Sequence, residues 1–178
     1  MSKKISIVTP TFNEEENIEK LCLKISEEMK KLNYDYEHII IDNQSEDDTI
    51  SIIKKIAEKD KKVKVIINAR NFGQIRSPMY AMLQTSGDAC IMMTSDFQDP
   101  PELIPRYISE WEKGNKIILG QKTTASENFL MNSFKNLFYK FIQSISEAPL
   151  IKNTTGSGLF SKDIVDQMRK IDDPYPYF

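Results

Sequence analysis

The sequence predicts an α/β fold in which a mostly parallel sheet is flanked by helices. Apolar runs rich in β-branched residues alternate with segments of helical period from the amino terminus to Gln121, as repeated βα units require. The chain has 178 residues, 40% of them hydrophobic, and contains no repeat or low-complexity stretch. We therefore expect one domain with its own core, spanning residues 1–178.

The expected strands are the apolar runs at 5–10, 38–42, 63–68, 89–94 and 116–120. The expected helices lie between them, at 14–32, 47–59, 75–85 and 101–113. The first helix carries a one-sided apolar stripe made by Ile18, Leu21, Cys22, Ile25 and Met29. This stripe predicts a face packed on the sheet.

After Gln121 the alternation loosens, and residues 126–146 predict a helix with an extensive apolar face. That face consists of Leu130, Phe134, Leu137, Phe138, Phe141 and Ile145. Burial in the core or against a second copy in a homodimer is favoured over a membrane surface, because only Lys135 and Lys140 supply basic flanks.

Composition excludes several classes of protein. The formal net charge of -2 arises from dispersed acids and bases, so no basic stripe indicates a nucleic-acid partner. Cys22 and Cys90 do not form the CxxC spacing of a metal site, so we expect both to be buried thiols in a reducing compartment. His38 is the single histidine and stands at the start of a strand, so we expect it to be structural. With one histidine at that place, the sequence lacks the residues for a catalytic triad or a histidine-rich zinc site. Without a signal peptide or a membrane-length apolar run, we expect a cytoplasmic domain.

Polar clusters follow the first four strands: "TPTFNEEENI", "DNQSEDDT", "NARNFGQ" and "SDFQDPP". None contains the glycine-rich phosphate loop of an ATPase or the fingerprint of a dinucleotide-binding enzyme. Because ligands bind outside the carboxyl ends of parallel strands, these four loops are expected to converge on one site.

The fourth cluster predicts a metal site. In extended backbone, Asp96 and Gln98 project to the same side while Phe97 packs the other way. Their oxygen atoms suit Mg²⁺ or Mn²⁺, and Mg²⁺ commonly completes its shell with substrate phosphates. Alternatively, Asp99 caps the next helix, with Pro100 or Pro101 in its first turn, and Asp96 is a solvated turn residue.

With these residues assembled, the chain resembles the family 2 inverting glycosyltransferases, which have the Rossmann-like GT-A fold. Within them it is similar to the branch that includes dolichol-phosphate mannosyltransferase and bacterial polyprenyl-phosphate sugar transferases. "SIVTPTFNEEENI" is similar to the family's opening strand and loop, "IIIDNQSEDDT" to VDDGSxDxT, "NARNFGQ" to an NxGxxxA-type loop, and "SDFQDPPELIP" to DADLQDPPE. Order and spacing agree over nearly the whole chain.

The resemblance implies roles for individual residues. The metal ligands it implies are Asp96 and Gln98. The substrate-binding residues it implies are Pro10, Phe12 and Glu14 in the nucleotide pocket, Asp42 at the base, Arg70 and Asn71 near the nucleotide sugar, and Lys122 near the diphosphate. A solvated side chain is an equal alternative for Lys122.

The chain also departs from the family pattern. The family's DDG is Asp42, Asn43 and Gln44 here, and the first Asp of its DAD is Thr94, so Asp96 must carry most of the metal charge. The later strand-to-helix pattern is kept at 156–168, with Ser161 as the expected N-cap. Relatives continue past this point, so we expect a glycosyltransferase catalytic domain truncated at its C-terminus.

The implied reaction moves a sugar, with inversion, from a nucleotide-diphosphate donor to a polyprenyl phosphate or a saccharide in cell-surface glycan synthesis. Asp96 would act through the metal, and Asp99 is a candidate general base by position. A UDP-sugar is favoured because Asp42 can accept from the ring N–H of uracil, with guanosine the competitor. A sugar nucleotidyltransferase and a non-catalytic nucleotide-sugar-binding module are the alternatives. The full-length protein could also associate with the inner face of the membrane.

Overall fold

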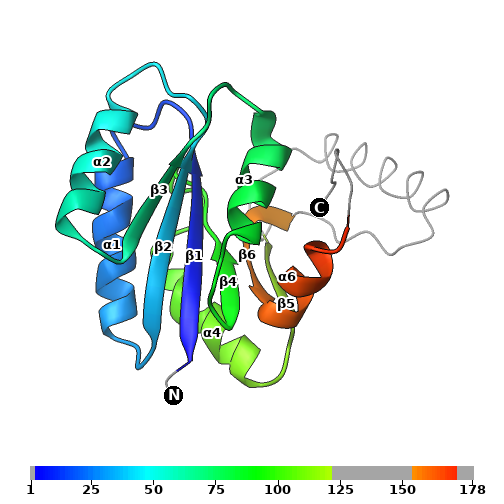
Figure 1. Cartoon of the computed structure of the whole chain (residues 1–178). Helices are drawn as coiled ribbons and strands as arrows, with labels where there is room; N and C mark the ends of the chain where they lie inside the picture. The colour runs from blue at the N-terminus through cyan, green and yellow to red at the C-terminus, as the bar shows by residue number, and fades with distance from the viewer. Residues whose placement is uncertain (1–2, 122–153, 172–178) are drawn as a thin grey trace, which may run out of the picture.

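The computed structural model describes residues 3–121 and 154–171, which form one layered α/β unit (Figure 1). The strands are β1 Lys4–Thr11, β2 Asp35–Asp42, β3 Val63–Ile67, β4 Ala89–Met92, β5 Ile117–Gln121 and β6 Thr154–Ser161. The helices are α1 Ile18–Lys30, α2 Thr49–Lys59, α3 Gly73–Leu83, the 3-10 turn η1 Pro101–Leu103, α4 Ile104–Glu112 and α6 Lys162–Met168.

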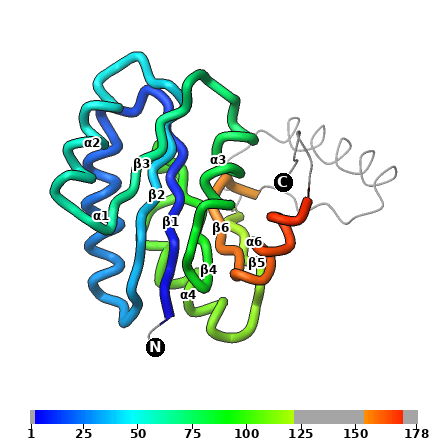
Figure 2. The backbone as a smooth tube through the Cα atoms, viewed as in Figure 1, coloured from blue at the N-terminus to red at the C-terminus, as the bar shows by residue number. Residues whose placement is uncertain are grey.

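The six strands form one mixed sheet in the order β3-β2-β1-β4-β6-β5. Strands β1 to β4 pair in parallel, whereas β6 lies antiparallel between β4 and β5. This arrangement confirms the mostly parallel sheet expected from the sequence. In Figure 2 the chain leaves β1 and β2 at the same edge of the sheet, as parallel pairing from Lys4↔Asp35 to Thr11↔Asp42 requires.

Helices cover both faces of the sheet, and each face has its own hydrophobic cluster. The larger cluster packs α1, α2 and α4 on strand residues such as Ile7 and Ile91, and it contains the whole apolar stripe of α1. The smaller cluster packs α3 and α6 on residues such as Val8 and Ile41. Cys22 and Cys90 are buried, as expected, and burial raises the pKa of each thiol to about 12, which keeps both protonated.

Most element ends shift by a few residues from their expected positions. Helix α1 begins at Ile18 because residues before it form a turn, in which the N–H groups of Asn17 and Ile18 both donate to the carbonyl of Glu14 (3.0 and 2.9 Å). Ser161 is the N-cap of α6, but its hydroxyl donates to Asp163 instead of accepting from the helix backbone. The apolar helix expected at 126–146 lies outside the described residues.

The amino-terminal edge of the sheet is held by a buried carboxylate, Glu37 of β2. Its two oxygens accept hydrogen bonds from Ser6 (2.7 Å), the Ser86 backbone N–H (2.8 Å) and Lys64 (2.5 Å), and Lys4 lies 3.2 Å away. Burial alone would raise the pKa of Glu37, but these bonds outweigh it and hold the pKa well below the usual range. The carboxylate therefore stays ionised and joins β1, β2, β3 and the segment before β4.

His38 has a structural environment, as the sequence predicts. It is buried, its Nε2 atom is hydrogen-bonded to Thr9 Oγ1 at 2.9 Å, and burial lowers its pKa to about 4. The imidazole is therefore neutral at neutral pH and sits inside the sheet, away from the strand ends.

Within the described residues, no helix is long and apolar enough to cross a membrane.

Candidate functional site

Four loops leave the carboxyl ends of β1 to β4 at one edge of the sheet: residues 12–17, 43–48, 68–72 and 93–100. Backbone hydrogen bonds continue the sheet into them, from Asn43 to Thr11 and from Asn68 to Asp42, both at 2.9 Å. The four loops contain eight aspartates and glutamates and a single basic residue, Arg70. The convergence expected from the sequence is present, and the resulting edge is strongly acidic.

The first and second loops are joined by side chains that bond to backbone groups. Asn13 N–H donates to Ser45 Oγ (2.8 Å), and Asn13 Oδ1 accepts from Glu46 N–H (2.8 Å). Glu14 N–H donates to Thr49 Oγ1 at the start of α2 (2.8 Å). These reciprocal bonds satisfy backbone donors that loops otherwise expose, so the two loops form one rigid wall.

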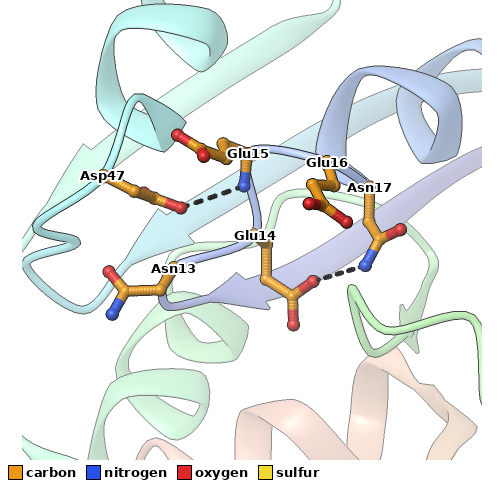
Figure 3. Close-up of a pocket in the computed structure, with 6 residues that line it drawn as sticks. All are labelled: Asn13, Glu14, Glu15, Glu16, Asn17 and Asp47. Carbon is orange, nitrogen blue, oxygen red and sulfur yellow. Dashed lines mark hydrogen bonds between the residues drawn. The ribbon is translucent and has the colours of Figure 1, made fainter.

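A pocket opens on this wall (Figure 3). Its lining is Asn13, Glu14, Glu15, Glu16, Asn17 and Asp47. Asp47 Oδ2 accepts from Glu15 N–H (3.2 Å), and Asn17 donates to Glu14 Oε2 (2.9 Å). Partial burial would raise the pKa of Asp47, but hydrogen bonds from Thr49 and the Glu15 backbone lower it overall. An acidic pocket of this kind suits cations or sugar hydroxyls, not a bare phosphate.

Asp42 is fully buried at the end of β2, and its carboxylate has partners within the second loop. Oδ1 accepts from the Ser45 backbone N–H (2.8 Å), and Oδ2 accepts from the Ser45 hydroxyl (2.5 Å). Ser45 in turn accepts from Asn13, so Asp42 fixes the connection between the first two loops. Pro10 is the last but one residue of β1, in register with Ile41, and Phe12, at 42% exposure, directly follows the strand.

The third loop is held by an asparagine network around Asn43. Asn43 Nδ2 donates to Asn71 Oδ1 (2.8 Å) and to the carbonyl of Gly73 (3.3 Å). Asn43 Oδ1 accepts from Phe72 N–H (2.8 Å) and Asn68 Nδ2 (3.1 Å). Sequence reasoning treated Asn43 only as a departure from a family pattern, because nothing local shows that its partners lie 25 to 30 residues away.

Arg70 and Asn71, the two residues expected near the nucleotide sugar, lie on this third loop. The guanidinium of Arg70 lies over the ring of Phe72, 4.7 Å from its centroid, and both side chains are exposed. Arg70 is therefore the only positive charge that the four loops present to a ligand.

The fourth loop differs from the extended segment that the sequence predicted. Phe97 adopts φ 55°, a left-handed conformation, so residues 94–99 form a turn in which Gln98 N–H donates to Asp96 Oδ1 (3.1 Å). The expectation of extended backbone is wrong, because the left-handed Phe97 turns the chain while its partly buried ring packs against the larger cluster. Asp96 and Gln98 are nevertheless both exposed at the edge, and Phe97 does pack inward.

Asp99 is 5% exposed and does not cap the next helix. The N-cap of η1 is Pro100, Pro101 is at the first position, and no side-chain cap bond forms in this described segment. Among the described residues, Asp99 Oδ2, the Tyr107 hydroxyl and the Ser157 hydroxyl are buried without hydrogen-bond partners. Burial, together with the nearby Asp99 charge, raises the pKa of Tyr107 to about 12. Asp99 is therefore a buried residue of the fourth loop, whereas Asp96 is exposed on the same loop.

The oxygen donors at this edge fit a hard divalent cation. Asp96 supplies an exposed carboxylate, Gln98 an amide on the same turn, and Thr94 a buried hydroxyl without a partner among the described residues. Within residues 3–121 and 154–171, no three His, Cys, Asp or Glu side chains gather closely enough to hold a metal alone. Such a set fits Mg²⁺ or Mn²⁺ whose shell is completed by substrate phosphates and water. Lys122 lies outside the described residues.

The fold and this edge define a GT-A glycosyltransferase. Residues 6–168 match the family model "Glycosyl transferase family 2", so the chain belongs to that family. Membership favours the glycosyltransferase interpretation over the nucleotidyltransferase and the non-catalytic module.

Relatives and solved structures agree with this assignment. The chain is 34% identical over 168 residues to a bactoprenol glucosyl transferase of Shigella phage SfX, covering 93% of this chain and 55% of that protein. It has the fold of the mannosyltransferase PcManGT from Pyrobaculum calidifontis in complex with GDP-Man and Mn²⁺ (TM-score 0.62, 14% identity, 94% of this chain, 47% of that one). It also matches S. aureus TarS 1-349 in complex with UDP-GlcNAc (TM-score 0.60, 17% identity, 97% and 48%). The chain spans about half the length of the curated relatives it matches.

Gln44 provides a test of backbone strain at this site. It adopts φ 66°, at the position where the family pattern has glycine, and left-handed backbone costs a side-chain-bearing residue about 1 kcal/mol. Gln44→Gly should therefore raise the free energy of unfolding by about 1 kcal/mol in chemical denaturation. The matched control is Gln84→Gly at φ -87°, which should lower it. A loss of stability in the Gln44 variant would contradict the assigned strain.

Proposed function

We propose that this domain transfers a sugar, with inversion, from a UDP-sugar to a polyprenyl phosphate, assisted by Mg²⁺ or Mn²⁺. The observation that carries the proposal is the exposed carboxylate of Asp96 at the carboxyl end of β4, in a family 2 domain. The bactoprenol glucosyl transferase similarity supports a lipid-phosphate acceptor, and the nucleotide-sugar complexes of structural neighbours support the donor class.

Electrostatics at the edge supports the metal. A nucleotide diphosphate is anionic, and the four loops present eight carboxylates against one guanidinium. Binding there needs added positive charge, and Asp96 with Gln98 would hold it beside the diphosphate. When bound, the metal supplies positive charge for the leaving diphosphate. Arg70 supplies further positive charge from the third loop. The acidic pocket that Glu14 lines is suited to sugar hydroxyls.

Burial of Asp99 supports a phosphate acceptor. A hydroxyl acceptor needs a general base within hydrogen-bonding reach, whereas a polyprenyl phosphate is already an anionic nucleophile. Asp99, the base candidate, is 5% exposed beneath its loop, while Asp96 is committed to the metal in this proposal. Burial therefore removes the base candidate of the fourth loop, which favours an acceptor that needs no base.

The acceptor assignment is tested by offering UDP-glucose and other UDP-sugars with either a polyprenyl phosphate in detergent or an oligosaccharide. We expect transfer to the polyprenyl phosphate, with Asp99→Asn keeping at least about a tenth of it, because loss of general base catalysis costs about 10²-fold or more where a base is used. Transfer to the oligosaccharide alone, or a much larger loss in the Asp99 variant, would overturn the choice of acceptor.

The metal assignment is tested by calorimetric titration of UDP with and without Mn²⁺. Asp96→Ala should remove the enhancement by metal and leave the fold intact, since the side chain is exposed and contributes little packing. Gln98→Ala should reduce it less, because water can replace a neutral ligand. The control Asp35→Ala removes an exposed carboxylate from the opposite end of β2. If Mn²⁺ strengthens UDP binding in the Asp96 variant as in wild type, the ligands lie elsewhere.

The base assignment is tested by the ratio of UDP to CDP affinity. Asp42 is fully buried and bonded to Ser45, so the proposed contact requires the second loop to move when the nucleotide binds. Asp42 would then accept from the ring N–H that uracil has and cytosine lacks, and leaving that donor unpaired costs about 1–3 kcal/mol. Asp42→Ala should therefore remove the preference for UDP. Ser45→Ala is the control, because it removes the internal partner of Asp42 and keeps the carboxylate. The ratio cancels general damage to the loop, so an unchanged preference in the Asp42 variant would refute the contact.

A further inference from the structure

The amide of Asn43 uses its full hydrogen-bonding capacity on the third loop. It makes two donations, to Asn71 and Gly73, and accepts two bonds, from Phe72 and Asn68. A primary amide has two donor hydrogens and an acceptor oxygen with two lone pairs, so no capacity remains. Asn43 itself is 8% exposed, while three of its partners are exposed, so these four hydrogen bonds are partly buried.

Backbone groups fix which end of the amide faces which partner. The N–H of Phe72 can only donate, so it requires the oxygen of Asn43 at 2.8 Å. The carbonyl of Gly73 can only accept, so it requires the nitrogen at 3.3 Å. Rotating the amide would break both contacts at once. The position therefore requires a side chain that carries both a donor and an acceptor.

An ionised aspartate does not meet this requirement, although aspartate is the residue in the DDG pattern that this chain resembles. A carboxylate could accept from Phe72 and Asn68, but it would face the Asn71 Oδ1 atom and the Gly73 carbonyl with a negative charge and no hydrogen to donate. Both oxygens would repel it, and the loop would have to move away.

We propose that Asn43 is a positioning residue that holds the third loop, and with it Arg70, in place for the donor diphosphate. The loop is anchored at both ends by the same side chain, because Asn43 bonds Asn68 at its start and Gly73 at its end. Arg70 lies between these anchors and is the only cation of the four loops. The inference rests on the proposed binding of a nucleotide diphosphate at this edge.

The test compares Asn43→Asp with Gln44→Glu, which adds the same charge one residue away at an exposed side chain. Asn43→Asp should weaken UDP binding in the presence of Mn²⁺ by about tenfold, and it should speed hydrogen exchange at the backbone amides of residues 68–73. Gln44→Glu should leave the exchange unchanged and weaken UDP by only about twofold.

A double-mutant cycle shows whether Asn43 acts through Arg70. Arg70→Gln should weaken UDP binding alone, and adding Asn43→Asp should weaken it little further, because the guanidinium that the loop positions is already absent. Additive losses, equal losses in the Asn43 and Gln44 variants, or unchanged exchange at 68–73 would each overturn the proposal. If wild type binds no nucleotide, the proposed function fails, and the exchange measurement still decides whether Asn43 holds the loop.

Discussion

The parallel pairing of β1 with both of its neighbours is the constraint on which the structure depends. β1 pairs with β2 from Lys4 to Thr11 and with β4 from Ile5 to Val8, so it is buried at the centre of the parallel part of the sheet. Parallel strands need crossover helices, and these helices close the two hydrophobic clusters on the two faces. The same pairing brings the carboxyl ends of β1 to β4 to one edge, so the loops that follow these strands lie together.

The loops at that edge keep their shape without glycine. Residues 12–17, 43–48, 68–72 and 93–100 contain none, yet Asn13, Gln44 and Phe97 adopt left-handed conformations there. Such conformations persist only when their surroundings stabilise them, and here side-chain bonds to backbone groups and the packing of the partly buried Phe97 ring do so. Among the described residues that carry a side chain, positive φ angles therefore occur only in these loops.

Carboxylates differ in burial and pairing between the two edges of the sheet. At the amino-terminal edge, Glu37 is buried and paired with Lys4 and Lys64, an arrangement that joins strands. At the carboxyl edge, Asp96 remains exposed, and Arg70 is the only basic residue of the four loops. Charge that is neutralised internally stabilises the fold, whereas charge left without a cation is available to a ligand. This contrast supports the proposal that a metal-bound diphosphate binds at the second edge.

The sequence by itself determined the strands, the helices and the core stripe of α1, because the periodicity of apolar residues is a local property. It also placed Asp42 and Asp96 at strand ends. Tertiary structure decided what surrounds these residues: Asn13 of the first loop donates to the Ser45 that bonds Asp42, and the partly buried ring of Phe97, next to Asp96, packs against the larger cluster. It also inserted β6 between β4 and β5 and set Asn43 against a loop 25 to 30 residues away. Contacts between distant segments depend on how the loops pack together, and no local pattern in one sequence records that packing.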